Sequence, residues 1–160
     1  MGAARPGLFT QIIQVLFACL VLGTAAQFLS PTRIPWHEDW SNRAKAKAEN
    51  AGIAIVDTEQ ARAIVDAGIA LIFDARSQGD YDADHLPGAL PFPDAKRAEF
   101  YPQYADVLTP DQQAMIYCTG ETCDESLELC MFLLEQGHTN ILLYLGGFTD
   151  WQEAGYPVAR

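Results

Sequence analysis

Basic residues are scarce in this chain. Its 160 residues include ten lysines and arginines against 21 aspartates and glutamates, which gives a formal net charge of −11. From residue 48 onward, five basic residues stand against 19 acidic ones. Such a surface repels the phosphates of nucleic acids, so we expect neither DNA nor RNA as a partner.

Cysteines are also few, and they are unevenly placed: Cys19, Cys118, Cys123 and Cys130. This number and spacing do not make the disulfide framework of a small secreted domain. Cys118 and Cys123 lack a second Cys or His pair at a closing spacing, so we do not expect a zinc site. The sequence has no glycine-rich phosphate-binding loop and no metal-ligand cluster, so we expect no cofactor.

Charge is missing altogether from Leu8–Leu29, a mostly apolar run long enough to span a bilayer as a helix. We therefore predict that residues 1–30 hold one transmembrane anchor, which makes the protein a single-pass membrane protein. The competing interpretation is a secretory signal peptide with Val15–Gly23 as its apolar core. More basic residues follow the span than precede it, which favours a cytoplasmic domain, whereas the short amino tail favours export. Between these signals we favour the extracytoplasmic side.

Residues 31–50 have the composition of a linker. Pro31 and Pro35 end helices, and Trp36 and Trp40 suit a membrane interface. The last ten residues of this segment, rich in Ala and Lys, predict a short exposed helix. Residues 51–160 then make up the globular domain.

Short apolar runs alternate with helical patterns through this domain. The spacing predicts strands at 53–56, 69–73, 114–117 and 141–144, and another short strand after the turn at 85–90. Asp57 or Thr58 starts a helix that Gly68 ends, and a second long helix covers 125–136. Alternation of this kind predicts an α/β fold with a parallel sheet and helices on both faces, preceded by the transmembrane helix.

The segment Met115–Ser126 is the strongest functional signal. A buried strand ends at Cys118, a short polar loop follows, and a helix opens at once. A thiol in this position lies among free backbone N–H groups near the positive end of the helix dipole. This environment stabilises a thiolate, the reactive form of cysteine, so we expect Cys118 to be a nucleophile.

Several motifs along the domain resemble single-domain rhodaneses, the sulfurtransferase family. They are Leu71–Ser77, His85–Ala89, Ile116–Cys118, Ser126, Leu145–Trp151 and Gly155–Val158, in the order and spacing of that family. The resemblance implies a five-stranded rhodanese-like sheet and a persulfide relay through Cys118. A sulfur donor would load the thiolate, and a thiol or a protein acceptor would remove the sulfur. The active-site loop would be Thr119, Gly120, Glu121, Thr122 and Cys123, whose backbone N–H groups would surround the terminal sulfur.

The resemblance also implies supporting roles for residues outside the loop. Asp74 and Arg76 are expected to form an ion pair near the site, and Ser126 is expected to hydrogen-bond to the loop backbone.

The loop departs from the family pattern because it has no basic residue and carries Glu121 beside the thiol. A nearby carboxylate opposes thiolate formation and repels anionic thiosulfate, so a neutral or protein-borne donor is more plausible. Phosphatases of a related fold end a longer loop with an arginine, where this chain has Asp124. An acid cannot bind phosphate as arginine does, so we reject phosphatase activity.

Two alternatives to sulfur transfer remain open. The Cys118/Cys123 pair also suits a thiol–disulfide redox module. The acidic loop suits a non-catalytic rhodanese module that binds a partner.

Overall fold

A five-stranded, all-parallel sheet with the strand order β1-β5-β4-β2-β3 is the centre of the fold. The computed structural model describes residues 7–29 and 40–160. The strands are β1 (Ala54–Val56), β2 (Leu71–Asp74), β3 (Ala89–Pro91), β4 (Ala114–Tyr117) and β5 (Ile141–Tyr144). The parallel α/β fold predicted from the sequence is thereby confirmed.

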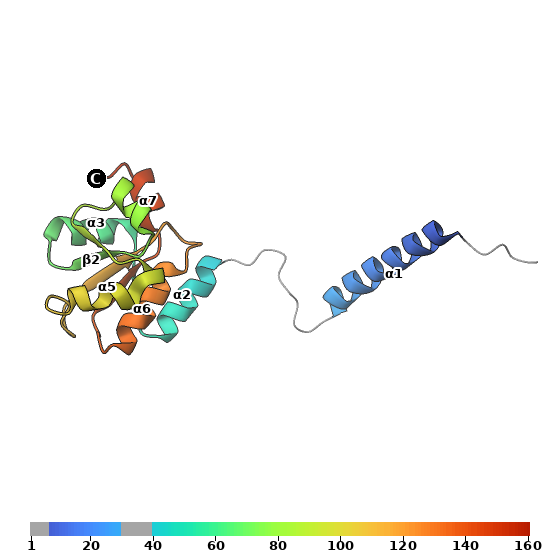
Figure 1. The fold of residues 1–160 in the computed structure, drawn as a ribbon, viewed down its shortest axis with the longest axis horizontal. Helices are drawn as coiled ribbons and strands as arrows, with labels where there is room; N and C mark the ends of the chain where they lie inside the picture. The colour runs from blue at the N-terminus through green and yellow to red at the C-terminus, as the bar shows by residue number, and fades with distance from the viewer. Residues whose placement is uncertain (1–6, 30–39) are drawn as a thin grey trace, which may run out of the picture. The chain divides into compact units, whose positions relative to one another are not determined.

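Helices cover both faces of the sheet (Figure 1). On one face, α2 (Trp40–Asn50), α6 (Glu125–Glu135) and the short helices α5 (Arg97–Phe100) and η2 (Tyr101–Tyr104) pack over the inward side chains of β2, β4 and β5. On the other face lie α3 (Thr58–Ala67), α4 (Gln78–Ala83) and α7 (Gly147–Glu153), around the fully buried Trp151. The short helix η1 (Asp94–Lys96) precedes α5.

Local chemistry explains where α3 begins and ends. The Asp57 carboxylate accepts a hydrogen bond from the backbone N–H of Gln60 at 2.8 Å, and the Gln60 side chain accepts one from the Asp57 N–H at 3.0 Å. This reciprocal pair satisfies two N–H groups that the first turn leaves free. Gly68 ends the helix with φ +61°, a conformation that glycine adopts without strain. The predicted boundaries of this helix are confirmed.

The register of the sheet aligns the carboxyl ends of β2, β4 and β5, next to which the functional site lies. Asp74 pairs with Tyr117 across β2 and β4, and Tyr117 pairs with Tyr144 across β4 and β5. These three residues end their strands at the same edge of the sheet. The carboxyl edge of a parallel sheet is where α/β folds place their ligands and reactive groups, and Cys118 follows β4 directly at this edge.

The short helix predicted at the end of the segment 31–50 is present as α2, and it packs on the domain. Residues 30–39 lie outside the described part of the chain, but Trp40–Asn50 is a helix of the compact unit that runs from Asp39 to Arg160. The helix is not exposed all round, because Ala44 and Ala48, one turn apart, are buried in the core. Lys47 also forms an ion pair with Glu128 on α6. The packed unit therefore begins before residue 51.

The helix α1 (Leu8–Leu29) forms part of a separate unit. Its stretch Phe9–Ala26 has a mean hydropathy of 1.9 and is long and apolar enough to cross a membrane. A signal sequence near the amino terminus has the same properties. An apolar amino-terminal helix is thus established.

Candidate active site

Cys118 is the first residue after β4, and its side chain is fully buried beneath the loop 119–123. The loop closes in a tight turn, in which the Cys123 N–H donates to the Gly120 carbonyl at 2.9 Å. This turn brings Cys123 back over Cys118. In its protonated form, the Cys118 thiol donates to the Cys123 carbonyl oxygen, with a sulfur–oxygen distance of 3.3 Å.

Several donors favour the thiolate form of Cys118. Its pKa is lowered to about 7, chiefly by a hydrogen bond from the Cys123 thiol, against the opposing effect of burial. The Ser126 hydroxyl donates to the Cys118 sulfur at 3.1 Å, and the backbone N–H groups of Ser126 and Gly120 contribute in the same direction. Ser126 lies in the first turn of α6, so the helix amino terminus also faces the sulfur. About half of the thiol is then ionised near neutral pH.

Ser126 differs from its expected role. The sequence predicts a hydrogen bond from its side chain to the loop backbone, whereas the structure directs its hydroxyl to the Cys118 sulfur. Ser126 is itself fully buried, so this bond forms without competition from water.

The amino end of α7 holds the loop from outside. The Phe148 N–H donates to the Cys118 carbonyl at 2.9 Å, and the Thr149 N–H donates to the Thr119 carbonyl at 2.8 Å. A side chain on Gly147 would clash with the Cys118 carbonyl and come within 2.9 Å of the Gly120 nitrogen, and its φ of +62° also favours glycine. Gly147 is therefore required for the close approach of α7 to the loop.

Asp74 and Arg76 form a buried network at the end of β2. The Arg76 guanidinium donates to the Asp74 carboxylate at 2.7 Å, and the Tyr117 hydroxyl donates to the same carboxylate at 2.6 Å. Arg76 also donates to the Asp84 carbonyl at 2.6 Å and stacks on Phe148, with 4.1 Å from its central carbon to the ring centroid. With Arg76 only 5% exposed, its charge is used to position α7 and is not presented to a substrate. Burial is the main cause that raises the pKa of Tyr117, which stays protonated as a donor.

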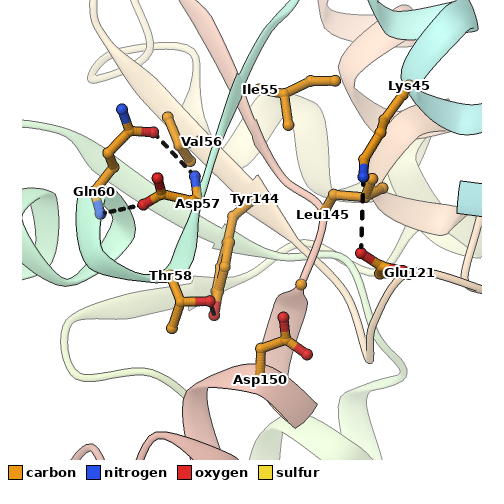
Figure 2. A pocket seen from close by; sticks show the side chains of 11 residues that line it. Lys45, Ile55, Val56, Asp57, Thr58, Gln60, Glu121, Tyr144, Leu145 and Asp150 are labelled. Carbon is orange, nitrogen blue, oxygen red and sulfur yellow. Dashed lines mark hydrogen bonds and ion pairs between the residues drawn. The ribbon is translucent and has the colours of Figure 1, made fainter. Parts of the chain in front are cut away.

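The rest of the loop is open to solvent. Thr119, Glu121 and Thr122 are exposed, and Gly120 is half-buried. Lys45 of α2 approaches Glu121, with its Nζ 4.0 Å from a carboxylate oxygen (Figure 2). Sequence reasoning missed Lys45 because it assigned this residue to a linker, and Tyr117 because its partner Asp74 is 43 residues away. The spacing of Ala44 and Ala48 was the one local signal of a packed α2.

A pocket of about 270 Å³ opens beside the loop at the carboxyl ends of β1 and β5 (Figure 2). Its polar lining comes from Lys45, Asp57, Thr58, Gln60, Glu121, Tyr144 and Asp150. The Tyr144 hydroxyl donates to the Thr58 hydroxyl at 3.2 Å across its floor. The pocket meets the loop at Glu121, whereas Cys118 is buried on the inner side of the loop.

Known proteins are similar to this chain in sequence and in fold. The chain is 25% identical over 103 residues to a thiosulfate sulfurtransferase of Actinobacillus succinogenes, covering 64% of this chain and 87% of the relative. It is 29% identical over 93 residues to an HTH-type transcriptional regulator of Mycobacterium tuberculosis, covering 58% of this chain but 39% of the regulator's length.

The fold also resembles the crystal structure of a thiosulfate sulfurtransferase from Pseudomonas aeruginosa. The TM-score is 0.60 at 21% identity, and the match covers 76% of this chain and 23% of that one. At this identity the likeness concerns the fold alone. The rhodanese-like domain family matches residues 42–154, which include most of α2 and the whole sheet. The chain therefore belongs to the rhodanese-like domain family.

Proposed function

We propose that this protein is a sulfurtransferase in which Cys118 carries sulfane sulfur as a persulfide and passes it to a thiol or another nucleophilic acceptor. The observation that carries the proposal is the Cys118 sulfur itself, held at a strand end with a pKa of about 7 and with the Ser126 hydroxyl at 3.1 Å. The thiolate attacks the outer sulfur of a donor R–S–SH, giving Cys118–S–SH and the thiolate RS⁻. A nucleophilic acceptor then takes the outer sulfur and regenerates the Cys118 thiolate.

The charges around the loop favour an uncharged donor. Glu121, Asp124 and Glu125 put three carboxylates on or next to the loop, and Lys45 lies 4.0 Å from Glu121. Thiosulfate carries two negative charges and approaches this surface against repulsion. A low-molecular-weight persulfide, uncharged in its protonated form R–S–SH, or a persulfide on a partner protein meets less of this repulsion. We therefore propose a persulfide donor and a thiol or protein acceptor.

A transfer assay tests the proposal. The purified full chain is incubated with cyanide and either thiosulfate or a small organic persulfide, and thiocyanate formation is followed. We expect turnover that requires Cys118, with the persulfide preferred over thiosulfate. Cys118→Ser is the inactive variant and Cys19→Ser is the matched control that removes a thiol from α1. Equal rates for Cys118→Ser and the unaltered protein would refute the assignment.

We propose further that α1 anchors the catalytic domain to the membrane as a single-pass protein, with the domain on the extracytoplasmic side. The support is the 18-residue apolar stretch Phe9–Ala26. After expression of the full chain, an anchor resists extraction from membranes by alkaline carbonate and leaves the mature mass intact. Protease added outside intact cells or spheroplasts then degrades the domain. A mature protein that lacks this stretch would identify it as a cleaved signal peptide, and protection from protease would place the domain in the cytoplasm.

A further inference from the structure

Cys123 lies against the reactive thiol and is free. Its carbonyl oxygen is 3.3 Å from the Cys118 sulfur, and neither residue is in a disulfide. Cys123 is half-buried, whereas Cys118 is fully buried beneath it. A second sulfur added to Cys118 therefore forms next to the Cys123 thiol.

Cys123 also contacts a carboxylate that is suited to accept its proton. The Cys123 thiol donates to a side-chain oxygen of Glu125, with a sulfur–oxygen distance of 3.4 Å. The hydrogen bond to Cys118, together with burial, raises the pKa of the Cys123 thiol, so it keeps its proton near neutral pH. A protonated thiol is a poor nucleophile and needs an adjacent base. Glu125, the first residue of α6, is positioned for that role.

We propose that Cys123 is a resolving thiol that attacks the inner sulfur of the Cys118 persulfide and releases the outer sulfur as sulfide. The inference rests on the proposed function, because it needs the persulfide. Glu125 takes the proton from Cys123, a bond forms between the Cys118 and Cys123 sulfurs, and the bond between the Cys118 sulfur and the outer sulfur breaks. The outer sulfur keeps the proton it carries in Cys118–S–SH and leaves as HS⁻.

The electrons in this step balance within the protein. The departing sulfur gains two electrons, and the two cysteine sulfurs together lose two as they form the disulfide. A thiol reductant then restores both cysteines, so that one sulfane sulfur and two external thiols give one sulfide and one external disulfide over a full cycle. The site would thus act as a persulfide reductase when no acceptor takes the sulfur.

A single-turnover experiment separates this activity from sulfur transfer. The reduced full chain is freed of reductant under anaerobic conditions and mixed with one equivalent of a small organic persulfide. We expect close to one sulfide per chain and a Cys118–Cys123 disulfide in non-reducing peptide maps. Cys123→Ser should retain one added sulfur on Cys118 and release sulfide at least about tenfold more slowly, and Cys19→Ser should match the unaltered protein.

The role of Glu125 as the base is tested by the ratio of sulfide released to persulfide formed on Cys118. Glu125→Gln should lower this ratio by about a hundredfold, as loss of a general base does. Glu125→Asp should restore part of it, and Glu135→Gln at the far end of α6 is the matched control. An unchanged ratio in Glu125→Gln would remove Glu125 from the step.

Two results would overturn the inference, and only one of them would also refute the proposed sulfur transfer. A stable Cys118 persulfide in the unaltered protein, with neither sulfide nor disulfide, would refute the resolving role of Cys123 and leave sulfur transfer in place. Absence of any Cys118 persulfide even in Cys123→Ser would refute both proposals.

Discussion

Removal of the Ser126 hydroxyl should raise the pKa of Cys118 and slow its reactions. The hydroxyl donates to the sulfur at 3.1 Å in a fully buried position, and a hydrogen bond to a charged group contributes about 1.5–3 kcal/mol. Since about 1.4 kcal/mol corresponds to one pKa unit, Ser126→Ala should move the pKa of Cys118 from about 7 to roughly 8–9.

This change has a definite consequence at neutral pH. The thiolate fraction at pH 7 should fall from about one half to between roughly one tenth and one hundredth. Alkylation of Cys118 by iodoacetamide, followed by peptide mass spectrometry across pH 5–10, measures that fraction. In the unaltered protein the rate should rise with pH through about 7 and then level off, whereas in Ser126→Ala the rise should come one to two pH units later.

Controls separate this effect from a general loss of structure. Thr139→Ala removes an exposed hydroxyl distant in sequence from the site, and it should leave the alkylation profile unchanged. Ser126→Thr keeps the hydroxyl and should restore part of the low pKa. An unshifted profile in Ser126→Ala, with the protein folded by circular dichroism, would refute the role assigned to this serine.

Three further variants test other contacts of the site. Gly147→Ala should destabilise the domain by at least about 1–3 kcal/mol in urea unfolding, because its φ is +62° and its Cβ would clash with the Cys118 carbonyl; an unchanged midpoint would contradict this packing. Asp74→Asn should cost about 3–5 kcal/mol by the same measurement, since the buried charge of Arg76 loses its partner; a loss under about 1 kcal/mol would show that the pair is not needed. Lys45→Gln should lower transfer from thiosulfate by no more than about fivefold, with little change for an uncharged persulfide, because the pair of Lys45 is largely solvated. The difference should disappear in high salt, and one that persists there would rule out an electrostatic cause.

The fold was accessible from the sequence because local signals agree with one another. The strands at 114–117 and 141–144 have the predicted bounds, and the capping residues of α3 are visible as Asp57 and Gly68. The second strand was placed slightly too early: Ile69 is 67% exposed, and β2 begins at Leu71. Apolar periodicity does not show where a strand begins when the turn before it is also apolar.

The residues that surround the site were harder to predict, because their contacts join distant segments of the chain. Most residues of α2 are polar or alanine, so the buried positions Ala44 and Ala48 give only a weak local signal. Its ion pair joins Lys47 to Glu128, which are 81 residues apart in sequence. Tyr117 meets Asp74 only when the register of β2 and β4 is known. Local patterns located the cysteine loop, and the sheet topology supplied what surrounds it. The chemical role of the loop residues stays a prediction.

Intact mass spectrometry of the full-length Cys123→Ser protein after incubation with a small organic persulfide is the most direct test of the central claim. The account predicts the mass of one added sulfur per chain, located on the peptide that contains Cys118 and removed by cyanide. The Cys118→Ser/Cys123→Ser double variant should gain nothing. No added sulfur in Cys123→Ser, or an equal gain in the double variant, would contradict the claim that Cys118 carries the sulfur.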